Sequence, residues 1–432
     1  MFKKIIYTFL FGLLVFFIVN LDFSRQIIKY LIPTEFRYKI KEFVFTKEVL
    51  NSIKFYHQVN YNEKKIPEIF FQTLSIKYLD LADVVLKPTS THYKNNPNMR
   101  TAFIEDLESS IFLITSYGET SKIEYFENKK IVKLIDNNIN KIFYQTKYNI
   151  KIVGSLLQDN YLYVSLYQVD KKNENNSSVC SKFSIIRAPI DQESKNLKFD
   201  IIFNSKSCDG SGQPGGEIAI DKKNNKLYFS TGTTDRDGGY LKLSQDDKSI
   251  YGKIIQLDLN NFNYKIFSKG HRNPQGLVFT KNGYLISTEH GPYGGDEINK
   301  IVKNGNYGWP VSSYGEHYGY PNESANEYQL KKNHSKFKFM EPIFAFVPSI
   351  GISKIIEVPK NFSNLMQNNF LITSLNRRSI YRVNFDEGFN KLLFMEEIRV
   401  GGRVRDIVFF KKTNSFVLYL EDIASLMIIS AK

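Results

Sequence analysis

The chain has 432 residues, enough for one large domain or two ordinary ones with an extensive core. Aromatic residues make up 15% of it, a fraction that excludes an intrinsically disordered protein. The net charge is +14, but the lysines are scattered, and there is no zinc-finger spacing, RNP-like run or basic helix. The positive charge therefore reflects overall composition, and we expect no nucleic-acid partner.

The N-terminus predicts attachment to a membrane. Lys3 and Lys4 precede an uncharged, mostly apolar run over residues 5–21, which is typical of a signal peptide or a short membrane-spanning segment. No small-residue cleavage pattern follows, so we favour an uncleaved anchor over residues 1–22. The two lysines then place the N-terminus in the cytoplasm and the body in the periplasm or outside the cell. Residues 23–95 predict a spacer with one or two short helices.

The two cysteines are compatible with export. Cys180 and Cys208 lie in one region of the chain, and in an oxidising compartment they would form one disulfide. Two buried free thiols are the alternative. A zinc site is not expected, because the sequence has no CxxC or CxH spacing.

A pattern of paired apolar runs recurs six times from about residue 96. Each pair consists of two short runs joined by a polar turn, such as EIAID and the run at 227–231. Turn dipeptides such as Asp159-Asn160 and Asn282-Gly283 are typical of hairpins between antiparallel strands. Hairpins spaced by roughly 46–86 residues predict an all-β six-bladed β-propeller over residues 96–432. A two-sheet sandwich is the rival, but its strands seldom repeat in units that long.

The loops of a propeller converge on its central channel, so residues just before the first run of a pair, or just after the second, are candidates for a site. They are Gln213, Arg272, Asn273, Glu289, Gly291, Pro292, Asn376, Arg377, Arg403 and Arg405. Several cations around one channel would bind a planar ligand with several carboxylates, because each guanidinium can clamp a carboxylate. The alternative is that each arginine pairs with a local acid, such as Asp406 or Glu421.

Residues 270–314 contain the only tryptophan and an unusual density of glycine. Their motifs GHRNPQG, EHGPYGGDEIN and NYGWPVSSYG resemble those of the soluble quinoprotein aldose (glucose/sorbosone) dehydrogenases. The segments SQDDKSIYGKIIQLDL and GGRVRDIVF extend the resemblance, which covers about residues 150–425. It implies a six-bladed propeller that carries pyrroloquinoline quinone (PQQ) and Ca²⁺ and oxidises a sugar or alcohol hydroxyl. The sequence does not indicate the electron acceptor.

The resemblance also implies roles for single residues. Arg272 and Asn273 would contact the quinone, and Arg403 and Arg405 would hold the carboxylates of the cofactor. The backbone carbonyls of Gly291 and Pro292 would bind Ca²⁺, which prefers such hard oxygen ligands. Glu289 is a further candidate for the metal. Tyr307 and Trp309, with Tyr314, would line the substrate pocket, although core packing is an equal alternative for each.

Two positions depart from the family pattern. The general-base histidine of the family falls on Gln213, or on Gly212 if the loop carries one extra residue, and neither takes a proton at neutral pH. The family lysine that polarises the quinone is replaced by Asn376, with Arg377 beside it.

The sequence therefore leaves three interpretations. The first is a slow dehydrogenase that uses another base, with Glu217, His271 and His290 as candidates. The second is a propeller that binds a ligand, glycan or protein partner without turnover. The third is a purely structural component of the cell envelope.

Overall fold

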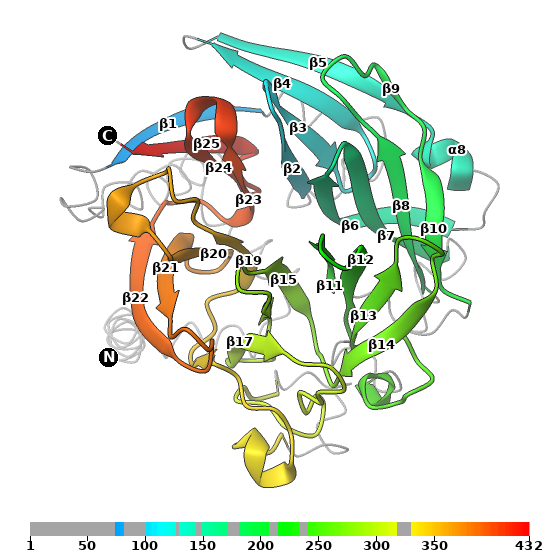
Figure 1. The fold of residues 1–432 in the computed structure, drawn as a ribbon, viewed down its shortest axis with the longest axis vertical. Coiled ribbons are helices and arrows are strands. Elements are labelled where there is room, and N and C mark those ends of the chain that lie inside the picture. The colour runs from blue at the N-terminus through cyan, green and yellow to red at the C-terminus, as the bar shows by residue number, and fades with distance from the viewer. Residues whose placement is uncertain are drawn as a thin grey trace, which may run out of the picture. The chain divides into compact units, whose positions relative to one another are not determined.

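Six β-sheets arranged around a central axis make up the fold (Figure 1). The computed structural model describes residues 74–81, 101–126, 129–143, 148–170, 181–206, 215–233, 241–317 and 330–431. The expected anchor at 1–22, most of the expected spacer, Cys180, Cys208 and Gln213 lie outside these ranges. Within them, no helix is long and apolar enough to cross a membrane. The anchor and the disulfide therefore stay predictions.

Each sheet is one blade, and the blades follow one another in chain order. Blade 1 contains β2 (Ala102–Leu107), β3 (Ser110–Thr115), β4 (Thr120–Phe126), β5 (Lys129–Asn137) and β9 (Asn196–Leu197). Blade 2 contains β6 (Tyr148–Gln158), β7 (Tyr161–Asp170), β8 (Ser181–Pro189) and β10 (Asp200–Asn204). Blade 3 contains β11 (Gly215–Asp221), β12 (Lys226–Thr231), β13 (Lys253–Asp258) and β14 (Tyr264–Lys269).

The second half of the ring repeats this plan. Blade 4 contains β15 (Pro274–Phe279), β16 (Leu285–Glu289), β17 (Asp296–Ile301) and β18 (Phe344–Phe346). Blade 5 contains β19 (Ile352–Glu357), β20 (Phe370–Ser374), β21 (Ser379–Phe385) and β22 (Leu392–Arg399). Blade 6 contains β23 (Val404–Phe410), β24 (Ser415–Leu420), β25 (Ser425–Ala431) and β1 (Leu74–Asp80). The short helices are α8 (Ile139–Phe143), η2 (Leu241–Ser244), η4 (His334–Phe337), η5 (Asn364–Met366) and η6 (Lys411–Thr413).

The predicted six-bladed propeller is confirmed. All six predicted hairpins exist and form the inner two strands of each blade, from β2 with β3 to β23 with β24. The six inner strands β2, β6, β11, β15, β19 and β23 pack side by side around the axis. They therefore bring residues from the whole chain to one channel.

The expected start of the propeller at residue 96 is wrong. β1 precedes that point and forms the outer strand of blade 6, where Leu74 pairs with Ala431 and Asp80 with Ser425. The two ends of the described chain are thus joined in one antiparallel sheet. Its hydrogen bonds close the ring and remove the free edge that β25 would otherwise expose.

The core consists of apolar layers between neighbouring blades. Six clusters of buried side chains fill the six blade interfaces of the described chain. Between blades 2 and 3, for example, Phe183 stacks on Phe229 at 5.3 Å between ring centroids. Because the apolar and aromatic side chains pack between the blades, the polar side chains of the inner strands are the ones that face the channel.

Five of the six inner strands have a register shift at the end where the site lies. The shifts fall at 152–154 in β6, 215–218 in β11, 274–276 in β15, 352–355 in β19 and 404–406 in β23. A β-bulge turns the extra residue away from the regular alternation. Gln275 and Arg405 are such extra residues, and Glu217 and Lys354 lie in the wider shifts. The bulges thus supply several of the polar residues that meet in the channel.

Candidate functional site

A buried ion cluster crosses the channel. Lys354 of β19 places its Nζ 3.1 Å from Glu217 Oε1 of β11 and 3.2 Å from Asp406 Oδ1 of β23. Asp406 Oδ2 also accepts the Ile104 backbone N–H at 2.8 Å, and Glu105 on the same strand accepts the Ser155 hydroxyl at 2.7 Å. One lysine therefore links blades 3, 5 and 6 beneath the mouth of the channel.

Glu217 holds a proton at neutral pH. Burial raises the pKa of its carboxyl to about 8, against the opposing effect of the Lys354 ammonium, and the charge of Asp406 adds to the rise. Its Oε2 has no hydrogen-bond partner in the described part of the chain. With Glu217 neutral, the Lys354 ammonium balances the Asp406 carboxylate, so little net charge is buried there.

Replacing Glu217 with Gln is expected to flatten the pH dependence of stability. The folded carboxyl keeps its proton up to about pH 8, whereas the unfolded one loses it near its ordinary 4.5. The folded state binds more protons in between, so stability falls as the pH rises from 5 to 8. Denaturant unfolding should show this fall reduced by on the order of 3 kcal/mol in Glu217→Gln. The same substitution at exposed Glu193 is the control, and an unchanged slope in Glu217→Gln would refute the assignment.

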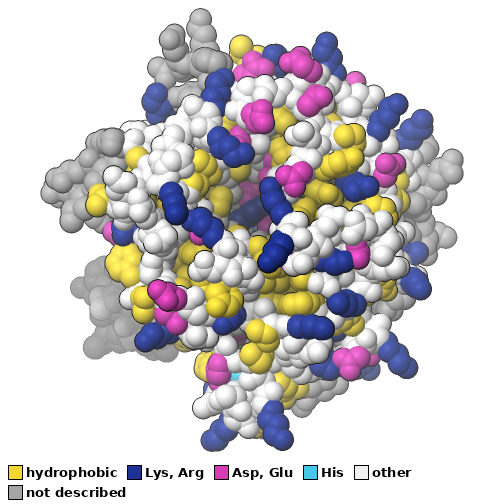
Figure 2. Space-filling model, in the orientation of Figure 1, with side chains coloured by type: hydrophobic (Ala, Val, Ile, Leu, Met, Phe, Trp, Pro, Cys, Tyr) yellow, Lys and Arg dark blue, Asp and Glu magenta, His cyan; other side chains and the backbone are white. Residues whose placement is uncertain are grey.

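Cationic side chains surround the mouth above this cluster. Figure 2 shows Lys and Arg side chains around a hollow at the centre of the ring, with acidic side chains deeper inside it. Arg403 Nε and Arg405 Nε lie 3.0 Å and 2.7 Å from the two oxygens of Glu421. Arg405 Nη1 also donates to Gln275 Oε1 of blade 4 at 3.1 Å. Pairing with Glu421, the local-acid alternative, is thus confirmed, whereas Asp406 pairs with Lys354 instead.

Two arginines on one acid leave an excess of positive charge. Burial opposes the ionisation of Glu421, but the charges of Arg405 and Arg403 outweigh it and lower the pKa of this carboxyl. The acid is therefore fully charged and neutralises one guanidinium only. The predicted pair of arginines keeps one unbalanced positive charge beside the channel.

Lys151 is a further cation that the sequence did not single out. It lies on the inner strand β6, and solvent reaches its side chain. Surrounding protein atoms still remove part of the water around the amine, and this desolvation and the neighbouring charge of Arg405 lower the pKa of the amine. No hydrogen bond or ion pair of the Lys151 amine is found within the described ranges. Lys151 belongs to the mouth because β6 is an inner strand, and this placement depends on the three-dimensional arrangement of the blades.

The loop before β15 is ordered by Glu289. Its Oε1 accepts the backbone N–H of Arg272, and that of Asn273 at 3.2 Å, while its Oε2 lies 2.9 Å from His271 Nδ1. Both oxygens of this predicted metal ligand are thus engaged in holding the Arg272 loop. Arg272 Nη1 in turn donates to the His290 carbonyl at 3.3 Å.

The predicted calcium seat lies in a tight turn fixed by Asp296. A side chain on Gly291 would lie 2.2 Å from the Gly294 carbonyl oxygen, so the turn requires glycine there. Asp296 is 1% exposed and its carboxylate accepts five hydrogen bonds. The donors are Gly291 N, Ser349 Oγ, Ile350 N, Gly351 N and Ile352 N. One carboxylate therefore sets both the Gly291 turn and the start of β19.

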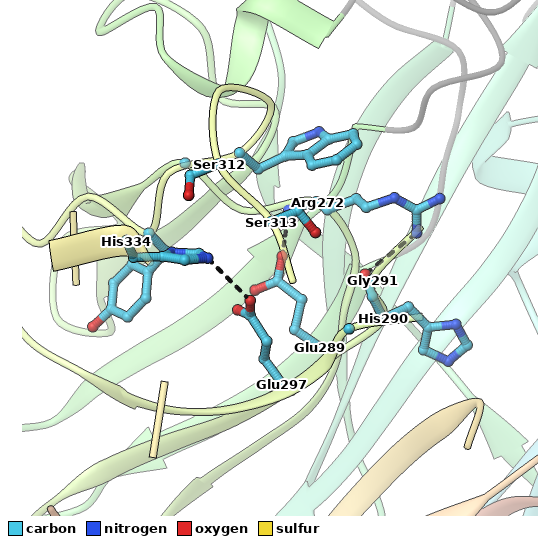
Figure 3. Close-up of a pocket in the computed structure, with 12 residues that line it drawn as sticks. Arg272, Glu289, His290, Gly291, Glu297, Ser312, Ser313 and His334 are labelled. Carbon is cyan, nitrogen blue, oxygen red and sulfur yellow. Dashed lines mark hydrogen bonds and ion pairs between the residues drawn. The ribbon is translucent and has the colours of Figure 1, made fainter. Parts of the chain in front are cut away.

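A small pocket lies beside this turn (Figure 3). Its lining includes Glu289, Glu297, Arg272, Trp309 and His334. Glu289 and Glu297 pair across strands β16 and β17, and His334 Nε2 lies 3.5 Å from Glu297 Oε1. Burial, and then the charge of Glu289, raises the pKa of Glu297 to about 8. At neutral pH Glu297 is therefore protonated, which avoids the repulsion of two buried carboxylates that face each other.

The residues proposed to line the substrate pocket differ in their surroundings. Tyr307 is buried between blades 3 and 4, where its hydroxyl donates to the Lys300 carbonyl at 2.6 Å, and it also lines the small pocket. Trp309 is buried, and Cζ of the Arg272 guanidinium lies 5.3 Å from the centroid of the Trp309 ring. Tyr314 stacks on His334 and donates to Glu341. Of the three, only Trp309 contacts a predicted cofactor residue in the described contacts.

The predicted replacements for the family lysine lie on the turn after β20. Asn376 and Arg377 are exposed, and their backbone N–H groups donate to the Ile350 carbonyl. The turn is therefore tied to the segment that Asp296 orders. No side-chain bond of either residue to the mouth arginines is found in the described ranges.

The three candidate bases are now distinguishable. His271 is fully buried and uses both ring nitrogens, on Glu289 and on Ser268 Oγ at 2.9 Å. Glu217 is bound to Lys354. His290 Nε2 has no hydrogen-bond partner among the described residues. Burial, and the charges of Arg272 and Arg405, keep the pKa of His290 low against the effect of Asp296.

The fold and site define a six-bladed propeller with a cation-lined channel. Residues 100–427 match the family model described as Glucose / Sorbosone dehydrogenase, and the chain belongs to this family. A quinoprotein glucose dehydrogenase B of Acinetobacter calcoaceticus is 46% identical over 122 residues, 22% of this chain and 26% of that protein. An aldose sugar dehydrogenase of Escherichia coli is 33% identical over 143 residues, 30% of this chain and 37% of that protein. These matches span well under two thirds of either relative.

Solved structures share the fold over a longer range. The apo-form of the soluble aldose sugar dehydrogenase from Escherichia coli superposes with a TM-score of 0.62, covering 83% of this chain and all of that one, at 16% identity. The PQQ-bound aldose sugar dehydrogenase from Streptomyces coelicolor gives a TM-score of 0.55 at 18% identity, covering 83% of this chain and 98% of that one. At such identities the likeness establishes the fold.

Proposed function

We propose that the protein is a PQQ-dependent sugar dehydrogenase that requires Ca²⁺ and oxidises a sugar or alcohol hydroxyl. The observation that carries the proposal is the set of cations at the mouth of the channel, where Arg403 and Arg405 share Glu421 among the described ion pairs and Lys151 lies near Arg405. Relatives named as a quinoprotein and a PQQ-bound enzyme support the same cofactor.

The residues present fit a planar ligand with three carboxylates. Arginine binds carboxylates bidentately, and the excess positive charge of the mouth favours a polyanion. Arg403 and Arg405 would hold its carboxylates, while Arg272 and Asn273 would contact the quinone edge. The carbonyls of Gly291 and Pro292 would bind Ca²⁺ in the turn that Asp296 fixes. When bound, PQQ would supply an acceptor for the hydride of the sugar carbon, and Ca²⁺ would make that acceptor more electrophilic.

The chain's own contribution to proton transfer is weak. The sugar hydroxyl must lose its proton as the hydride leaves, and Gln213 cannot accept it. His271 and Glu217 are engaged elsewhere. We therefore propose slow turnover, with binding and orientation supplied by the arginines. We also propose that residues 1–22 anchor the body outside the cytoplasm and that a sugar is the substrate.

Reduction of a dye acceptor by a series of aldoses tests this function. We expect PQQ with Ca²⁺ to produce sugar-dependent reduction above the rate without protein, and removal of Ca²⁺ with a chelator to abolish it. A boiled sample is the control for free PQQ chemistry. Tight PQQ binding without any turnover would instead favour the alternative of a ligand-binding propeller, and the absence of both would exclude the dehydrogenase.

A further inference from the structure

The backbone of Trp309 is held on both sides. Its N–H donates to the Gly270 carbonyl at 3.0 Å. Its carbonyl accepts two side-chain bonds, from Ser244 Oγ at 2.7 Å and Gln245 Nε2 at 2.6 Å. These contacts fix the backbone from which the ring extends, and so the starting point of the side chain. From this backbone position the indole lies over the guanidinium of Arg272, a predicted ligand contact.

The indole N–H of Trp309 is available. The residue is 3% exposed and lines the pocket beside Arg272, yet Nε1 has no hydrogen-bond partner among the described residues. A buried indole N–H usually has an acceptor, because leaving it unpaired costs free energy. A bound ligand would supply the acceptor that the described residues do not provide.

The backbone of the turn that carries Ser244 and Gln245 is itself held by the buried side chain of Lys253. Lys253 is fully buried, and its Nζ donates to the carbonyls of Leu243 at 2.6 Å, Ser244 at 3.0 Å and Tyr251 at 2.8 Å. Three acceptors match the three donors of an ammonium group. Gly252 allows this close approach, since a side chain there would lie 2.5 Å from Ser244 Cβ.

A second contact ties the same turn to the tryptophan loop. Asn306 Nδ2 donates to Gln245 Oε1 at 2.7 Å, and Gln245 Nε2 donates to Asn306 Oδ1 at 3.0 Å. Asn306 lies three residues before Trp309 in the sequence. The side chains of the turn thus hold the tryptophan loop at two points, the Asn306 amide and the Trp309 carbonyl.

We propose that residues 241–245 form a positioning element that holds Trp309 against Arg272 and directs the indole N–H to the bound ligand. Ser244 and Gln245 act through the Trp309 carbonyl, and Lys253 acts through the turn. The ligand part of this inference rests on the proposed function. The positioning part stands on the contacts alone.

The single tryptophan of the chain makes the proposal measurable. In Ser244→Ala, and more strongly in Ser244→Ala with Gln245→Met, we expect red-shifted Trp309 emission and at least about twofold greater quenching by acrylamide. PQQ affinity at saturating Ca²⁺ should fall about tenfold in the double variant, the range of a weakened cation–π contact and a lost donor. Ser244→Thr, which keeps the hydroxyl, should restore the wild-type emission.

The control is Gln168→Met, which removes a buried glutamine bonded to Ser184 in blade 2, away from Trp309. Unchanged emission and quenching in folded Ser244→Ala and in the double variant would overturn the positioning role. Altered emission with unchanged PQQ affinity would overturn the directed N–H. Failure of the wild type to bind PQQ would count against the proposed function, while the emission measurements would still decide the positioning role.

Discussion

Replacement of Asp296 with Ala is expected to lower the free energy of unfolding by about 3–5 kcal/mol, because five donors lose one buried acceptor together. Four of these donors are backbone N–H groups, which cannot rotate away to find water. The change therefore acts on the Gly291 turn and on the start of β19 at the same time. Denaturant unfolding followed by circular dichroism measures the effect.

A matched change at the surface separates this role from a general cost of losing an aspartate. Asp247 is 78% exposed at its side chain and contacts only Lys269 Nζ, at 2.7 Å, among the described salt bridges. Asp247→Ala should change stability by less than about 0.5 kcal/mol. If Asp296→Ala behaved like Asp247→Ala, the turn would not depend on the carboxylate, and the placement of the calcium seat would be wrong.

Replacement of Gln213 with His is expected to raise the rate of sugar oxidation by about 10²-fold or more, if loss of the base alone limits turnover. The resemblance places the base at this position, and a histidine with a pKa near neutrality can take the hydroxyl proton. Steady-state kinetics with PQQ, Ca²⁺ and a dye acceptor measures the change in kcat.

Gln213→Asn is the control, because it keeps an amide and shortens the side chain. It should not exceed the wild-type rate. An unchanged kcat in Gln213→His, with PQQ affinity retained, would show that the channel obtains its base elsewhere. His290 would then be the first residue to test, since its Nε2 has no partner among the described groups.

The sequence predicted the inner half of the fold because hairpins are local. Each predicted pair joins neighbouring strands through a short turn, such as Asn282-Gly283, and the alternation of buried residues fixes the register. β1 was missed as part of the propeller because its partner β25 lies at the other end of the chain. Outer strands such as β22 carry a weaker signal, since Leu393 and Phe394 are exposed there.

The site was predicted in part, and the division follows from geometry. Arg403 and Arg405 do meet at the channel and share Glu421, which short motifs and the order of the blades were enough to suggest. Lys354 and Lys151 were missed because each is a lone lysine in a strand. The partners of Lys354 lie on other blades, and so does Arg405, whose charge acts on Lys151. The bulge that sets Lys354 toward the axis has no sequence signal of its own.

Calorimetric titration of PQQ into the protein tests the central claim most directly. We predict saturable binding with Ca²⁺ present, loss of binding in chelator, and a weakening of about 1.5–3 kcal/mol in Arg403→Ala, the strength of a charge-assisted hydrogen bond. Arg403 is suited to this test because its removal leaves Glu421 paired with Arg405. Absence of PQQ binding by both the wild type and Gln213→His with Ca²⁺ in excess would contradict the account, and the channel would then serve a different ligand.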